Sequence, residues 1–203
     1  MALVGDFQAL GAVGLSIKAM IEAGFSARQP IAGGQLTKVV VVRTNDLDLE
    51  GDTEIVLPAV SLLLYRVQIS PSLAAPSAAG ALDGGRTYLP LELHYLVTAW
   101  ADNAEHEHLI LGRVAQLLHA APVLDGLMLH PSGGWAAQDQ LELIFEDLPL
   151  ADVMRTFDAL DVDYRLSLPY LARVVVMTDP NELDWPEVAL ATIGIGGMAG
   201  ALP

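Results

Sequence analysis

The residues best suited to chemistry lie in the run Glu105-His106-Glu107-His108, which places two imidazoles and two carboxylates in four positions. Such groups are common ligands of divalent metals. However, residues two apart on an α-helix point about 200° apart, so the two histidines cannot easily converge on one ion. His94 completes a metal site only if this helix start folds over the strand that carries it. We therefore predict no metal ligands and expect the run to be a solvated helix start, favoured by the helix dipole.

Three further patterns look like ligand sites, but each has a simpler interpretation. The run from Asp46 to Gly51 matches the first half of a calcium loop, yet Leu57 stands where the twelfth-position glutamate is required. We expect a sharp turn there instead. Asp161 and Asp163 share a face and are expected to be solvated. Residues 194–199 fit the glycine fingerprint of dinucleotide sites, but the sequence offers no following helix to hold a pyrophosphate.

The sequence favours a protein without catalytic activity. It contains no cysteine, no Gly-x-Ser-x-Gly elbow and no Gly-Lys-Ser/Thr phosphate loop. We therefore predict no catalytic, cofactor-binding or metal-binding residues, and no cofactor. The competing enzyme hypothesis is a metal-assisted hydrolase that uses His94, His106 and His108, with Glu105 as a further candidate.

A strand followed by a helix, within 86–123, positions most of these side chains. Every second residue of the first half is apolar, as in a strand with one buried face: Leu89, Leu91, Leu93, Tyr95, Val97 and Ala99. In the second half the apolar residues recur at helical spacing: Ile110, Val114, Leu117, Leu118 and Ala121. We expect a capping box of Asp102 and Glu105 to begin this helix, and Pro122 to follow its end. The helix can then fold back over the strand.

Before this unit, the sequence predicts a helix and two strands. Asp6 is expected to cap the helix, which ends at Ala23 with Gly24 in a left-handed conformation. The valine-rich run 38–43 predicts a buried strand. Residues 55–69 predict a long strand, bent near Pro58, whose odd-numbered apolar residues share one face.

After this unit, the sequence predicts a strand, a helix and a strand. The strand lies at 141–146, and Pro149 begins the short helix. The last strand is predicted over 164–176, where apolar residues alternate without interruption. The order of elements predicts an α+β fold, with a mixed, mostly antiparallel sheet of about five strands covered by helices on one face.

The chain divides into a domain at 1–177 and an extended C-terminal arm at 178–203, where prolines and glycines break the pattern. Within the domain, residues 70–85 show no periodicity and are longer than a usual hairpin loop. We expect this segment to be a mobile loop or a contact loop.

Composition and charge narrow the classes of partner. The chain has 203 residues, of which 53% are hydrophobic, and its formal net charge is -15. An acidic surface repels phosphate, so nucleic acid is not an expected partner. No uncharged apolar run reaches the roughly 18 to 20 residues of a membrane helix, and no secretion signal opens the sequence. We expect synthesis in the cytoplasm, no membrane partner, and subunit contacts that use the surplus of apolar residues.

Four runs of this sequence together resemble one known family. They are 62–67, reading Leu-Leu-Leu-Tyr-Arg-Val, 89–99, 111–119 and 164–170. The most specific part is Leu-Pro-Leu-Glu-Leu-His-Tyr-Leu, followed by Leu-Gly-Arg-Val-Ala-Gln-Leu-Leu-His. The family is the cap, or tail-terminator, protein of phage-tail-like contractile injection systems of the antifeeding-prophage and virulence-cassette type, and the resemblance covers roughly 7–177.

This resemblance implies a tail-terminator-like fold and a structural role. Six copies would form a homohexameric ring that ends the inner tube and anchors the last layer of the sheath. The implied partners are further copies of the chain, the inner-tube protein and the sheath protein, the last of these through 178–203. The resemblance also implies that the chain becomes part of an assembled phage-tail-like particle that is released from the cell. A further alternative, a head-to-tail connector of a DNA phage, needs a basic lumen that this composition makes hard to build.

Overall fold

The computed structural model describes residues 3–5, 7–33, 36–48, 53–70, 88–135, 139–160 and 162–178. Most of the loop at 70–85 and of the arm at 178–203 lies outside these residues, so the predictions made for both segments stay predictions. The described helices are α1 (Ala9–Ala27), α3 (Ala104–Ala120) and α4 (Leu150–Leu160). The strands are β1 (Leu3–Gly5), β2 (Lys38–Val42), β3 (Ala59–Ile69), β4 (Tyr88–Trp100), β5 (Val123–Asp125), β6 (Gln140–Phe145) and β7 (Ser167–Thr178). Short 3-10 turns occupy Thr44–Leu47, Gly126–Met128 and Pro131–Gly133.

The strands form a single sheet in the order β2-β3-β4-β7-β6-β5, and β1 pairs with β7 beside this path. The pairs β1–β7 and β2–β3 are parallel, whereas the other four pairs are antiparallel. The predicted α+β fold with a mixed, mostly antiparallel sheet is thus confirmed. The sheet has seven strands rather than about five, because β1 and β5 are three residues each, too short to show a periodic pattern.

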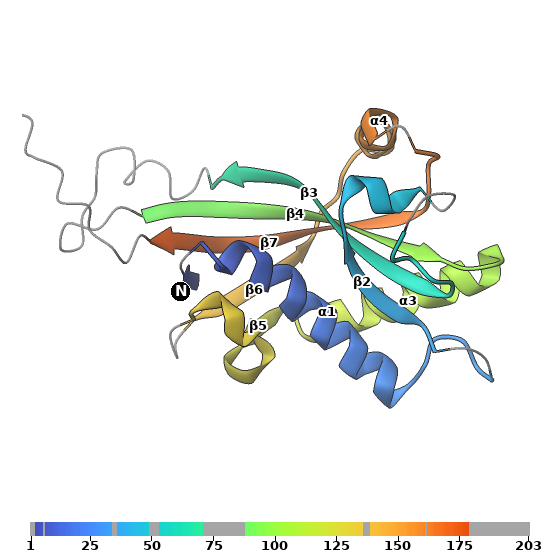
Figure 1. Ribbon diagram of the computed structural model, residues 1–203, viewed down its shortest axis with the longest axis horizontal. Helices are drawn as coiled ribbons and strands as arrows, with labels where there is room; N and C mark the ends of the chain where they lie inside the picture. The colour runs from blue at the N-terminus through green and yellow to red at the C-terminus, as the bar shows by residue number, and fades with distance from the viewer. Residues whose placement is uncertain are drawn as a thin grey trace, which may run out of the picture.

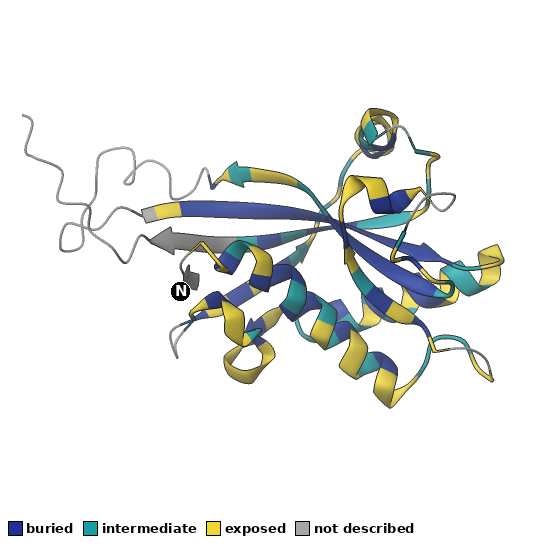
Figure 2. Ribbon diagram, in the orientation of Figure 1, coloured by how far each residue is buried: buried dark blue, intermediate teal, exposed yellow. Residues whose placement is uncertain are grey.

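The central strand β4 is buried on both faces (Figure 2). Its predicted apolar series packs under α1 and α3, and we call this side the α1/α3 face. Leu96 and Trp100 point to the opposite side, where they pack against Val153 and Phe157 of α4. We call this second side the α4 face. The predicted helical cover therefore holds for α1 and α3, while α4 lies on the other face, well apart from α1 in Figure 1.

Two register shifts change which residues share a face. In β3 the shift lies between Leu64 and Arg66, so that Val67 is opposite Leu93. Val67 thus aligns with the α1/α3 side of β4, whereas Leu63 packs on the α4 face. The prediction that the odd-numbered residues of 55–69 share one face was therefore wrong beyond Tyr65, because a bulge adds one residue to the strand.

The second shift affects the last strand. Leu93 of β4 is opposite Ala172, but Leu91 is opposite Val175, so β7 has one extra residue between these pairs. The uninterrupted alternation predicted for 164–176 does not hold across this point. Periodicity alone cannot reveal a bulge, because both halves of the strand still alternate.

The helix ends differ from two predictions. Helix α1 begins after Gln8, which makes no side-chain cap bond, and it continues through Gly24 to Ala27; Asp6 lies outside the described residues. Gly24 is needed for packing: a Cβ there would lie 2.4 Å from Leu117 of α3. Helix α3 is capped by Asn103, whose side chain accepts a hydrogen bond from the His106 backbone N–H, rather than by Asp102.

Helix α1 is long and apolar enough to cross a membrane by length and composition. In this fold it is a core helix, because its inner side, including Val13, Ile17 and Ile21, packs against the sheet. Its polar side carries the Lys18–Glu22 ion pair.

Candidate functional site

The structure does not bring the predicted histidines together. The Nδ1 of His94 lies 2.9 Å from an oxygen of Glu146, whereas the ring of His106 contacts Asn103. His108 is exposed on α3 and lies at the edge of a different cavity. Among the described residues, no group of three or more His, Cys, Asp or Glu side chains could hold a metal ion. The arrangement required by the metal-assisted hydrolase is therefore not formed by His94, His106 and His108.

His94 instead belongs to a network on the α4 face, which we call the polar layer: Gln68, Ser70, Glu92, His94, Glu146 and Arg173. Glu92 is 6% exposed and accepts hydrogen bonds from Gln68 Nε2 at 2.8 Å and Ser70 Oγ at 2.9 Å. Arg173 Nε lies 3.8 Å from the same carboxylate. Each carboxylate of the layer therefore has a partner from another part of the sheet. Such satisfied groups stabilise a fold and leave little free capacity for binding.

Tyr65 borders this layer. The centroids of its ring and the His94 ring are 6.1 Å apart, in an edge-to-face arrangement. Burial, and to a smaller degree the negative charge of Glu146, raises the pKa of Tyr65 to about 12. The phenol therefore stays protonated at any physiological pH. The hydroxyl–carboxylate pair of this layer, Ser70 and Glu92, is buried and so is not presented to a substrate at the surface.

The acidic turn after β2 is organised by one ion pair. The Asp46 carboxylate accepts the backbone N–H of Arg43 at 2.9 Å and the Arg43 Nε–H at 3.1 Å. These bonds, led by the backbone one, hold the pKa of Asp46 below its ordinary value. Thr53 donates its hydroxyl to the Asp46 carbonyl. Glu50 and Gly51 lie outside the described residues, so the turn predicted here is seen only in part.

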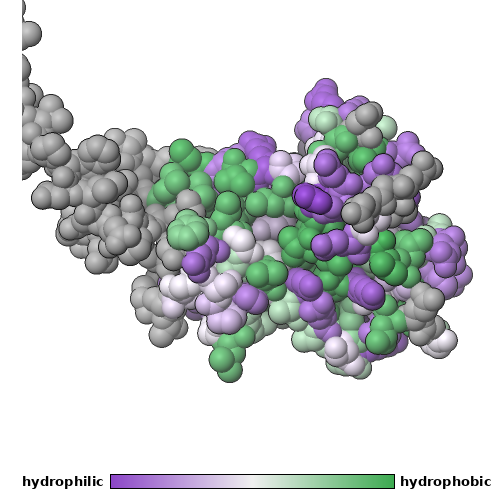
Figure 3. Space-filling model, in the orientation of Figure 1, coloured by the Kyte–Doolittle hydropathy of each residue, from purple (hydrophilic) through white to green (hydrophobic). Residues whose placement is uncertain are grey.

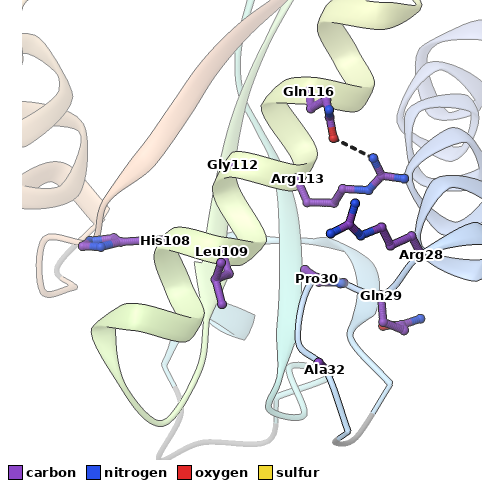
Figure 4. A pocket seen from close by; sticks show the side chains of 9 residues that line it. All are labelled: Arg28, Gln29, Pro30, Ala32, His108, Leu109, Gly112, Arg113 and Gln116. Carbon is purple, nitrogen blue, oxygen red and sulfur yellow. Dashed lines mark hydrogen bonds between the residues drawn. The ribbon is translucent and has the colours of Figure 1, made fainter.

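A cavity of about 510 Å³ lies between the end of α1 and the outer side of α3 (Figure 4). We call it the arginine pocket. It is lined by Arg28, Gln29, Pro30, Ala32, His108, Leu109, Gly112, Arg113 and Gln116. Sequence reasoning did not find this pocket, because Arg28 and Arg113 are far apart in the chain and form no motif. The only sequence signal was Gly112, a glycine inside an otherwise good helix.

The long strands extend beyond the helices (Figure 1), and several apolar side chains in this part of the molecule are exposed. Val67 and Ile69 near the end of β3 are 44% and 55% exposed, and Phe7 before α1 is 77% exposed. Figure 3 shows apolar atoms gathered over the end of β3 and the start of α1. Neighbouring exposed apolar residues of this kind are typical of surfaces that contact another protein.

Two solved structures resemble this fold. The anti-feeding prophage cap, described as the AFP tube terminating cap, is 19% identical with a TM-score of 0.50, over 89% of this chain and 59% of that chain. The PVC sheath/tube terminator of an extracellular contractile injection system, in its extended state, is 14% identical with a TM-score of 0.48, over 93% of this chain and 65% of that chain. This chain thus spans less than two thirds of either one, and the first likeness shows a shared fold.

The comparison with curated proteins gave no match. Among protein families, the sequence profile described as the Pvc16 N-terminal domain matches residues 12–189, which include most of α1, all of α3 and α4, and every strand from β2 to β7. Because this match covers most of the sequence, the chain belongs to the Pvc16 N-terminal domain family.

Proposed function

We propose that this chain is a structural subunit that terminates the inner tube of a contractile injection particle. The observation that carries the proposal is the family match over residues 12–189. The fold shared with a tube-terminating cap supports it. The polar layer is consistent with a scaffold role, because its carboxylates are engaged within the sheet. We assign no catalytic residue and no cofactor to this function.

The subunits are proposed to close into a hexameric ring. A cyclic ring needs two different surfaces on each subunit, which meet head to tail. One such surface is proposed to include the exposed apolar residues Phe7, Val67 and Ile69. The outer edge of β2 supplies another, since β2 ends the strand order and a sheet edge can pair with a neighbouring chain.

The proposed partners of the ring are the inner-tube protein and the last layer of sheath. Sheath anchoring is assigned to the arm at 178–203, which follows directly from the last strand. A subunit with a net charge of -15 suits a particle that loads protein better than one that passes DNA, because a ring would repeat this charge. We propose synthesis in the cytoplasm and assembly into the particle without membrane or nucleic-acid contact.

The proposal is tested by mixing the purified chain with assembled inner tubes. Light scattering and negative-stain images should show closed rings, or density only at tube ends. Binding along the sides of the tubes, or no binding to tubes and no ring at any concentration, would contradict the proposal.

A truncated chain ending at residue 178 tests the arm separately. Because β7 ends at Thr178, the cut leaves every described element in place. The truncated chain should still bind tube ends but lose attachment to the sheath. Sheath capping equal to that of the full chain would remove the arm from the proposal and leave tube termination intact.

A further inference from the structure

The arginine pocket is built from the end of one helix and the side of another. Helix α1 ends at Ala27, and Arg28 follows as its C-cap residue. Across the cavity, α3 contributes Leu109, Gly112, Arg113 and Gln116, whose spacing of three, four and seven residues places them along one helix face. Figure 4 shows the guanidinium groups of Arg28 and Arg113 side by side, while His108 points away from them.

Among the described cations, Lys38, Arg66, Arg28 and Arg113 have no carboxylate partner, and of these only Arg28 and Arg113 line one cavity together. Carboxylates pair with Lys18, Arg43, Arg155, Arg165 and Arg173. Within the described residues, neither Arg28 nor Arg113 has a carboxylate within ion-pair distance. This is unexpected in a chain with 25 acidic and 10 basic residues, because adjacent positive charges raise the free energy unless an anion lies nearby.

Internal bonds hold Arg113 in position without using all its donors. Its Nη2 donates to the Gly24 carbonyl at 3.1 Å, and its Nη1 donates to Gln116 Oε1 at 2.7 Å. The Nε–H is buried, and among the described residues it has no hydrogen-bond partner. Arg28 is exposed at the rim. One fixed and one adjustable guanidinium thus face the same cavity, which suits the planar, two-oxygen geometry of a carboxylate.

Gly112 lines the pocket and is exposed on the surface of α3. A Cβ at this position would meet no atom within 4 Å. A glycine inside a helix costs roughly 1 kcal/mol relative to alanine, and no close contact within the fold requires one here. This contrasts with Gly24, where Leu117 occupies the space of a side chain. The open space at Gly112 is therefore available to a group from outside the subunit.

We propose that the arginine pocket receives an Asp or Glu side chain from a neighbouring copy of this chain. The inference rests on the proposed ring, and it assigns one of the head-to-tail contacts. The charge balance favours a second copy as the partner. Subunits with a net charge of -15 repel one another. A ring therefore needs contacts in which an acidic side chain of one copy binds an unpaired cation of the next. The unpaired arginines supply such a contact at one place on each subunit.

The strength of the contact is tested by sedimentation of the full chain over a range of concentrations. Arg28→Gln should weaken association between copies about tenfold, a typical effect of losing a charge-assisted bond. Gly112→Gln should weaken association as well, by placing a side chain in the cavity. The matched control is Arg155→Gln, which removes the same charge from an exposed pair with Asp152 on α4 and should leave association unchanged.

The location of the contact is tested by photo-crosslinking. The chain has no cysteine, so Ala32→Cys gives a unique thiol at the pocket rim for a benzophenone label. Mixing isotopically light and heavy chains separates links between copies from links within one copy. The expected product joins residue 32 of one copy to an Asp- or Glu-containing peptide of another, and Arg28→Gln should reduce its yield about tenfold.

Several outcomes would overturn the proposal, and they differ from a failure of the proposed function. If rings form but the crosslink and the Arg28→Gln effect are absent, the pocket assignment is wrong and tube termination stands. A crosslink to added tube or sheath protein, with none between copies, also overturns it. If the wild-type chain neither associates nor binds tube ends, the proposed function fails and this contact fails with it.

Discussion

The polar layer and the arginine pocket use charged side chains in opposite ways. In the polar layer, Glu92 is engaged by Gln68 of the adjacent strand β3, and Glu146, which follows β6, is engaged by His94 of β4. In the arginine pocket, Arg28 and Arg113 face a cavity without a carboxylate partner among the described residues. The residue types alone suggest the reverse, because histidine and glutamate clusters are more typical of functional sites. The comparison shows that two unpaired cations facing one cavity, rather than residue type, indicate where this chain has capacity to bind.

The largest expected effect on stability is in the polar layer. His94→Ala should lower the free energy of unfolding by about 2–3 kcal/mol, because it leaves the mostly buried Glu146 carboxylate without its partner and opens a cavity. Chemical denaturation measures this loss. Arg155→Ala is the control, since it breaks an exposed ion pair worth less than about 1 kcal/mol. If both variants lose the same free energy of unfolding, the buried pair contributes no more to stability than the exposed pair, which would contradict this prediction.

Gly24→Ala tests the helix contact beneath the arginine pocket. The new Cβ would overlap Leu117, so we expect a loss of about 1–2 kcal/mol despite the better helix propensity of alanine. In a Leu117→Ala background the penalty should vanish, which a double-mutant cycle detects. Gly11→Ala, where no atom lies within 4 Å, should instead stabilise α1. A stabilising Gly24→Ala would contradict the close approach of α1 and α3.

Asp46→Asn tests how much the ion pair of Asp46 with Arg43 stabilises the acidic turn. Loss of the charge-assisted bonds to Arg43 should cost roughly 1 kcal/mol at pH 7. Because the pKa of Asp46 is lowered in the folded state, its stabilising effect is complete above the unfolded value and is lost as the pH falls through the folded value. Denaturation at pH 7 and near pH 3 should therefore show the difference between wild type and variant shrinking in acid. A constant difference would contradict this role of the carboxylate.

Gly112→Gln tests whether the fold needs a glycine at this position of the arginine pocket. Replacing a helical glycine by a good helix former should raise the free energy of unfolding by about 0.5–1 kcal/mol. Thermal or chemical denaturation provides the measurement. A loss of stability would mean that the fold itself needs this glycine.

The smallest expected effect on stability is that of Arg28→Gln. Arg28 is exposed, and within the described part of the chain no carboxylate pairs with it, so the free energy of unfolding should change by less than about 0.5 kcal/mol. Measuring the free energy of unfolding of Arg28→Gln and His94→Ala under the same conditions compares the arginine pocket with the polar layer. A loss as large as that of His94→Ala would show that the pocket is a structural site.

Periodicity in the sequence predicted the long elements of this fold because their burial is regular. The alternation in 89–99 gave β4, and the helical spacing in 110–121 gave α3. It could not reveal the burial of β4 on both faces, since Glu92, His94 and Thr98 look like solvent-facing residues until their partners from other strands are known. The bulge near Tyr65 is invisible for a similar reason, because each half of the strand alternates normally.

The candidate sites were harder to predict because they depend on distant segments. Sequence spacing predicts that His106 and His108 point apart on their helix, but it could not show that His94 contacts Glu146, 52 positions away. Gly24 was interpreted as a helix end, although its role is to admit Leu117 of another helix. Arg28 and Arg113 come together only through the packing of α1 against α3.

The central claim, that this chain terminates the tube, is tested most directly by the length of particles assembled with and without it. Electron microscopy of particles that lack the chain should show tubes of widely varying length with no closing density at the tube end. Adding back the wild-type chain should restore a narrow length distribution and density at that end. Particles of uniform length and normal end structure in the absence of the chain would contradict the account.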